Sequence, residues 1–110
     1  MNVYDTANRL AGEIKTSEEY ITYKKAKEYI DLKPELKEKI MDFEKMRYEA
    51  QLATLQEGKD DEEKMKKMQE LYAELIEIPE VKQYFDTELK FNVLLADVNK
   101  IISEAVADVI

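Results

Sequence analysis

Hydrophobic residues recur at helical spacing along most of this chain, most clearly in its last thirty residues. Between Glu80 and Ile110 there is neither Gly nor Pro, and two series repeat every seven residues: Phe91, Val98 and Ala105, and Leu95, Ile102 and Val109. This pattern is typical of a long amphipathic helix whose apolar face needs a partner surface. A helix of this length would measure about 45 Å, which favours a helix-paired or self-associating protein.

Capping residues and prolines predict the helices that precede it. The first is expected over residues 3–15, with Asn2 as its N-cap. Thr16 and Ser17 are competing caps for the second helix, which ends near residue 32 because a residue that precedes a proline avoids the helical region. Pro34 is a good first-turn residue for a third helix that runs to about Glu57.

Gly58 suits the left-handed position that follows a helix, and Asp60 with Glu63 has the spacing of a capping box. A fourth helix is therefore expected over residues 61–77, and Pro79 separates it from the last helix. The connection between the third and fourth helices is so short that they must form an antiparallel hairpin. The sequence predicts an all-α fold of about five helices, a single helical-bundle domain over 1–110 with a long hairpin and a long C-terminal helix.

The third helix carries two apolar stripes on different faces. The stronger stripe is Leu36, Ile40, Phe43, Met46, Ala50 and Ala53. Phe43 lies at its centre, and we expect it to be buried between the hairpin and the fifth helix. The second stripe is Met41, Tyr48, Leu52 and Leu55. A helix on one side of a small bundle needs only one apolar face, so the second stripe predicts the interface of a two-fold symmetric homodimer.

Composition excludes several classes of function. The net charge of −8 disfavours direct binding to nucleic acids, whose affinity depends on Lys and Arg. The chain has no Cys and no His, so it lacks the usual ligands of zinc and iron–sulfur sites and the commonest general base. The acidic run at residues 60–63 fits a helix start better than a calcium loop. We therefore expect no catalytic residues, no metal and no cofactor.

Two further expectations follow from the same residues. No apolar run approaches the ~20 residues that span a bilayer, and Met1 leads directly into polar residues rather than a signal peptide, so a cytoplasmic protein is expected. Most of the seven Tyr fall on inward stripes, where a ring is more often core than ligand platform. Tyr48 is the exception, because Tyr is enriched at interface cores.

The order of several segments resembles the YlbF/YmcA family of small helical proteins from Gram-positive bacteria, especially its YheA-like branch. The matching segments are 17–20 (SEEY), 23–26 (YKKA), 34–36 (PEL) leading to Phe43, Gly58, Pro79 with Val81 and Tyr84, and 94–102 (LLADVNKII). The resemblance covers nearly the whole chain and rests on the order and spacing of core and cap residues.

The resemblance implies an all-α fold, homodimers or mixed assemblies, and a cytoplasmic, non-catalytic role. Two better-known members act with a third protein in a complex that modulates endoribonuclease Y, and they carry cysteines near the C-terminus that hold an iron–sulfur cluster. This chain ends without any Cys. The leading interpretation is a regulatory protein that acts through protein–protein interactions with a partner of unknown identity. The alternative is an accessory factor in RNA turnover that acts with endoribonuclease Y.

Overall fold

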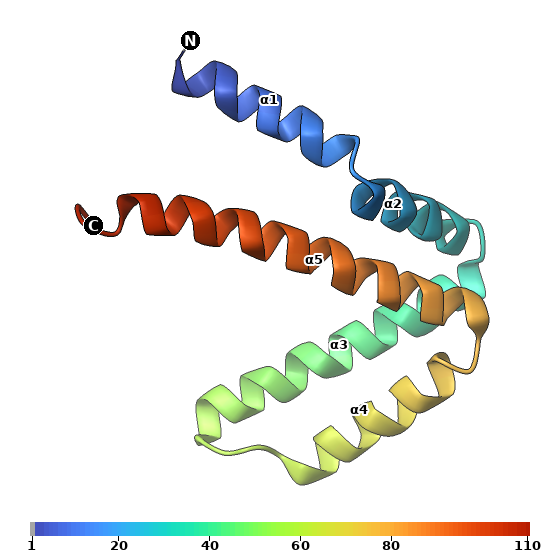
Figure 1. Ribbon diagram of the computed structural model, residues 1–110. Helices are drawn as coiled ribbons and strands as arrows, with labels where there is room; N and C mark the ends of the chain where they lie inside the picture. The colour runs from blue at the N-terminus through green and yellow to red at the C-terminus, as the bar shows by residue number, and fades with distance from the viewer. Residues whose placement is uncertain (1) are drawn as a thin grey trace. The chain divides into compact units, whose positions relative to one another are not determined.

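The computed structural model describes residues 2–110, and within them the chain is helical with no strand. Five helices follow one another: α1 (Val3–Lys15), α2 (Glu18–Asp31), α3 (Pro34–Glu57), α4 (Glu62–Leu75) and α5 (Pro79–Val106) (Figure 1). Helices make up 85% of the chain. The prediction of an all-α fold with five helices is confirmed.

The helix starts follow the expected chemistry, with one correction. The Asn2 side chain accepts a hydrogen bond from the backbone N–H of Asp5 at 2.9 Å, and Ser17 rather than Thr16 accepts from the N–H of Tyr20 at 3.2 Å. The cap of α4 is Asp61, which accepts from the N–H of Lys64, so the expectation of Asp60 was wrong. Asp60 instead accepts a hydrogen bond from the Thr54 hydroxyl at 2.9 Å, across the loop.

Two helix ends also differ from the prediction. Helix α4 stops at Leu75, two residues earlier than expected, because residues 76–78 form a turn in front of Pro79. The proline disfavours helical geometry at the residue before it. Helix α5 stops at Val106 and not at Ile110; residues 107–109 form a turn. Terminal residues without packing partners commonly leave the helix in this way.

The chain divides into two compact units, and each is described separately. One unit comprises residues 2–27 and Tyr84–Ile110, and the other comprises Glu28–Gln83. The single domain over 1–110 stays a prediction.

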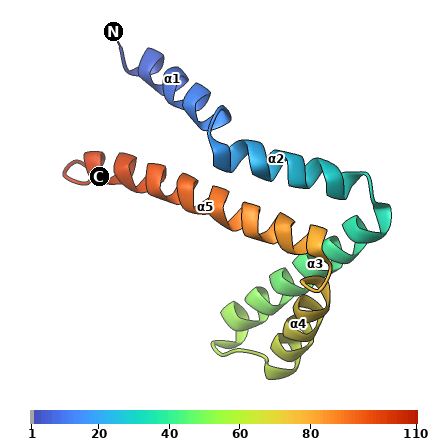
Figure 2. The same cartoon turned by 45° about the vertical axis from the view of Figure 1, so that its right-hand side comes forward.

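The Glu28–Gln83 unit is built around the α3–α4 hairpin. Its two helices run antiparallel and are joined by a short loop, as Figures 1 and 2 show. Gly58 ends α3 with a φ of 74°, the left-handed conformation predicted for it. The buried residues of this unit are Ile30, Ile40, Phe43, Ala50, Ala53, Leu75 and Val81. The burial of Phe43 is confirmed, and its ring lies 5.5 Å from that of Tyr72. Its position against the fifth helix stays a prediction.

The other unit is held by aromatic contacts between α2 and α5. Tyr23 stacks on Phe91 with ring centroids 5.6 Å apart, and Tyr20 meets the same ring edge-on at 5.9 Å. Tyr23 also packs against Tyr84, and its hydroxyl donates to a carboxylate oxygen of Glu88 at 3.4 Å. Such ring pairs each contribute about 0.5–1.5 kcal/mol beyond the burial of their area. These tyrosines therefore act as packing residues.

Candidate interaction surfaces

The second stripe of α3 is exposed. Met41 is 57%, Tyr48 62% and Leu55 80% accessible to solvent, and Leu52 is half-buried. Among the buried residues of α3, Phe43 packs against Tyr72 of α4. By helical spacing the stripe lies on another face of α3 than these buried residues. The structure thus brings the four predicted interface residues together on one helix face and leaves three of them largely uncovered.

The charge pattern marks the same part of α3. Charged residues make up 38% of the chain, yet residues 50–56 (AQLATLQ) carry none. These residues span about two helical turns, so the helix is uncharged around its whole circumference. On one side of the helix the lack of charge is explained by burial, since Ala50 and Ala53 are core residues. The side that carries Leu55 faces solvent, where a lone helix would normally present charged residues.

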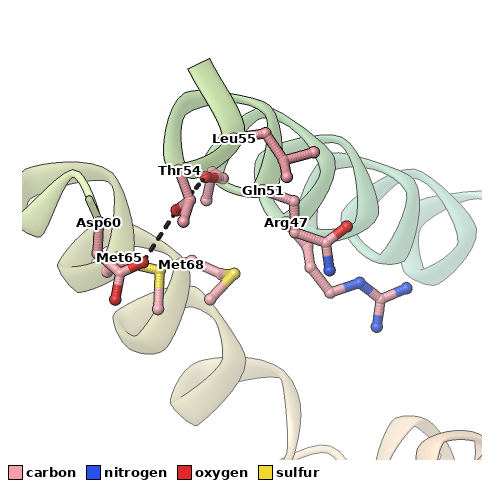
Figure 3. Close-up of a pocket in the computed structure, with 8 residues that line it drawn as sticks. Arg47, Gln51, Thr54, Leu55, Asp60, Met65 and Met68 are labelled. Atoms are coloured by element: carbon pink, nitrogen blue, oxygen red, sulfur yellow. Dashed lines mark hydrogen bonds between the residues drawn. The ribbon is translucent and has the colours of Figure 1, made fainter. Parts of the chain in front are cut away.

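An apolar groove of about 560 Å³ lies between α3 and α4, beside the stripe. Figure 3 shows the residues that line it. From α3 come Arg47, Ala50, Gln51, Thr54 and Leu55, and from the loop and α4 come Asp60, Met65 and Met68. Methionine side chains are flexible and polarisable, and they adapt to irregular apolar partners. Leu55 belongs to both the stripe and the groove, so the two form one continuous surface.

Polar contacts fix the rim of this groove. The Thr54 hydroxyl has two acceptors within reach, the carbonyl oxygen of Ala50 at 3.0 Å and the carboxylate of Asp60 at 2.9 Å. A hydroxyl has a single proton to donate, so the two acceptors share it. The bond to Asp60 ties the end of α3 to the start of the loop. At the other end, the Arg47 guanidinium lies 5.7 Å from the centre of the Phe43 ring.

Sequence reasoning found the stripe but missed the groove. Met65 and Met68 line the groove from α4, and both are half-buried. Neither helix alone indicates a hollow, because its lining comes from α3, from α4 and from the loop between them. Arg47 makes no ion pair with any carboxylate in residues 2–110, a feature that the sequence does not reveal.

A second apolar surface lies in the other unit, at the ends of α1 and α5. No residue of α1 is buried. A hollow of about 510 Å³ is lined by Asn2, Val3, Thr6, Ala7 and Leu10 from the start of the chain and by Ile102 from α5. Ile102, on the main stripe of α5, is 52% exposed, and Val109, in the turn that follows the helix, is 85% exposed. Asp97 and Glu104 lie seven residues apart in α5, and Asp108 follows in the turn after the helix.

The acidic residues form no metal-binding cluster in the part of the chain that the structure describes. Within residues 2–110 no three carboxylates converge in the way a metal site requires. The acidic residues that follow Gly58 act locally: Asp61 caps α4, Asp60 accepts from Thr54, and Glu63 pairs with Lys67 at 3.3 Å. Over the same residues, no helix is both long and apolar enough to cross a bilayer.

The fold and these surfaces define a class of small all-helical proteins whose prominent exposed features are apolar helix faces. Residues 3–107 match the family described as "Control of competence regulator ComK, YlbF/YmcA". Because this match covers nearly the whole chain, the protein belongs to the YlbF/YmcA family.

Relatives of similar length support the assignment. A UPF0342 protein of Caldicellulosiruptor saccharolyticus is 37% identical over 105 residues, covering 96% of this chain and 88% of the relative. A UPF0342 protein of Symbiobacterium thermophilum is 38% identical over 104 residues, covering 94% and 93%. One from Desulfitobacterium hafniense is 34% identical over 110 residues, covering all of this chain and 89% of the relative. The resemblance seen in the sequence is thereby confirmed at the level of the family.

Proposed function

We propose that this protein is a non-catalytic cytoplasmic regulator that acts by binding other proteins, and that its working form is a homodimer. The observation that carries the proposal is the exposed second stripe of α3. The family description names the control of a competence regulator. Because control of another protein is the role printed for the family, it supports the proposal that this chain regulates through protein contacts.

The physical argument concerns uncovered apolar surface. Met41, Tyr48 and Leu55 are each more than half exposed on one helix face, and the groove extends this face toward α4. Each Å² of apolar surface removed from water contributes about 25 cal/mol. Contiguous exposed apolar patches are uncommon on soluble monomers and usually mark interaction sites. A homodimer covers such a face with one symmetric contact.

The test is sedimentation equilibrium of the wild-type protein and of the double variant Leu52→Glu/Leu55→Glu. We expect a wild-type dimer and a folded monomer, or a much weaker dimer, for the variant. The matched control is Leu89→Glu, because Leu89 is an exposed leucine on α5 with 65% accessibility. Circular dichroism of each variant checks that its helices remain.

Two results would count against this assignment. A wild type that stays monomeric at about 100 micromolar would end the homodimer proposal. A double variant that dimerises as tightly as wild type would show that the interface lies outside α3. The apolar end of α5 would then be the first alternative location. The variant Ile101→Glu/Ile102→Glu then tests that second location directly.

A further inference from the structure

The groove between α3 and α4 has the size and the lining of a small-molecule site. Its volume of about 560 Å³ lies within the roughly 300–1,000 Å³ of ordinary ligand pockets. Such pockets are mostly apolar and carry a few polar groups that orient the ligand. Leu55, Met65 and Met68 supply apolar side chains here, and the two methionines can adapt to a flexible partner. The lining therefore suits an alkyl chain.

The charged groups of the lining differ from one end of the groove to the other. At the loop end, the Asp60 carboxylate accepts a hydrogen bond from the Thr54 hydroxyl at 2.9 Å. Arg47 lies seven residues before Thr54, about 10 Å away along α3. Figure 3 shows Arg47 and Asp60 toward opposite ends of the lining. A ligand with one negative group is therefore attracted to the Arg47 end and repelled from the Asp60 end.

The Arg47 guanidinium is available to an anion. It makes no ion pair with any carboxylate in residues 2–110, and it lies 5.7 Å from the centre of the Phe43 ring. Phe43 packs against Tyr72 of α4, so the guanidinium lies on the side of α3 that meets α4. Gln51, one turn further along α3, adds an amide donor to the lining. A guanidinium binds a carboxylate through two parallel hydrogen bonds.

We propose that the groove binds an alkyl carboxylate of medium chain length, a fatty acid or a related acyl acid. Its carboxylate pairs with Arg47, and its chain lies along Met68, Met65 and Leu55. Leu55 is eight residues after Arg47, about 12 Å along α3, a span that a chain of medium length covers. This site is additional to the proposed binding of proteins and does not depend on it.

The second hollow supplies a contrast. Its lining in residues 2–110 consists of Asn2, Val3, Thr6, Ala7, Leu10 and Ile102, and none of these is charged. It can take up apolar atoms but offers no cation to a carboxylate. The preference for an anionic ligand is therefore assigned to the groove between α3 and α4.

The first measurement compares decanoate with decylammonium, two ligands with the same tail and opposite charges, below the concentrations at which they form micelles. By calorimetry we expect decanoate to bind with a dissociation constant of about 0.1–1 millimolar, in keeping with its size. The chain's net charge of −8 favours the cation wherever general charge and apolar surface decide the binding. Decanoate should nevertheless bind at least about fivefold tighter than decylammonium, because its charge meets Arg47.

The methionines locate the ligand in the wild-type protein. Isotope labelling of their methyl groups gives NMR signals that single Met→Leu variants assign. Decanoate should shift the signals of Met65 and Met68, which line the groove. Met41 is 57% exposed and lies outside the groove, so its signal should stay in place. It is the internal control for adsorption of the tail to any exposed apolar surface.

Two variants test the role of the guanidinium. Arg47→Gln should weaken decanoate binding at least about fivefold, because a hydrogen bond between charged groups is lost. The matched control is Arg9→Gln, the same substitution at the chain's only other arginine. Arg9 lies on α1, pairs with Glu13 at 3.6 Å and is distant in sequence from the groove, so this variant should bind decanoate like the wild type. Circular dichroism checks that both variants keep their helices.

Each contrary outcome removes a defined part of the inference. Decylammonium that binds as tightly as decanoate, or equal weakening by Arg47→Gln and Arg9→Gln, would overturn the pairing with Arg47. A shift of the Met41 signal as large as that of Met65 would show adsorption to exposed apolar surface and overturn the site. Absence of any shift at Met65 and Met68 would do the same. All of these are read at one protein concentration and without reference to sedimentation, so the site and the proposed homodimer stand or fall separately.

Discussion

Replacing Phe43 with alanine tests the centre of the Glu28–Gln83 unit. The side chain is 5% exposed, and its ring contacts Tyr72 at 5.5 Å and the Arg47 guanidinium at 5.7 Å. Truncation of a buried Phe to Ala costs about 3–5 kcal/mol, made up of lost apolar transfer energy and the cavity that remains. Loss of the Tyr72 ring contact contributes about 0.5–1.5 kcal/mol of the same total.

We expect Phe43→Ala to lower the free energy of unfolding by about 3–5 kcal/mol. This is a large share of the roughly 5–15 kcal/mol that stabilises an ordinary domain. The assay is urea denaturation followed by the helical signal in circular dichroism. The protein concentration is held fixed, because the proposed dimerisation would add to stability. An unchanged slope with urea, and a shifted midpoint, would show that stability alone has changed.

The matched control is Leu89→Ala, which removes a large apolar side chain that is already 65% exposed. Its loss should stay within about 0.5 kcal/mol, as is usual for surface positions. A loss below about 1 kcal/mol for Phe43→Ala would refute the reasoning, because no buried ring of this size is removed so cheaply.

Two further predictions concern the backbone and the absence of metal ligands. Gly58→Ala should destabilise the protein by about 1–2 kcal/mol in the same urea assay, because Gly58 has a φ of 74° and alanine resists that conformation even with open space around it. Gly12→Ala should have the opposite sign, a gain of about 0.5–1 kcal/mol, since Gly12 lies inside α1 with nothing within 4 Å of an added methyl. Elemental analysis of the untagged protein should find neither iron nor zinc at one per chain, because thiolate and imidazole ligands are missing from the sequence; either metal at that ratio would contradict this.

The sequence was sufficient for the helices because their signals are local. Asn2, Pro34 and Gly58 each act within one turn of the chain, and each has the predicted role in the structure. The failure at the start of α4 has a tertiary cause. Asp60 and Asp61 are chemically alike, and either can cap a helix. The Thr54 hydroxyl on the preceding helix binds Asp60, which leaves Asp61 to cap α4.

The candidate site was predictable only in part. The spacing of Met41, Tyr48 and Leu55 on one helix reveals the stripe without any knowledge of other helices. The groove depends on how α3 and α4 are placed against each other, and on the direction in which Arg47 extends from α3 to the groove lining. Both are properties of two helices together, so neither can be derived from the periodicity of one.

Helix α5 shows the limit of periodicity most directly. Its apolar stripe repeats with the same spacing throughout, yet Tyr84 and Thr87 are buried, Phe91 is half-buried, and Ile102 is exposed. Burial along α5 depends on which side chains cover it and not on the apolar spacing. The rings of Tyr20 and Tyr23 cover the first half of the helix. Helix α1 has no buried residue and leaves the second half open. An amphipathic pattern predicts that one face of a helix must be covered, and it does not identify what covers that face. In this family of regulators an uncovered face is therefore informative, because the chain retains apolar residues at the positions where its own helices do not reach.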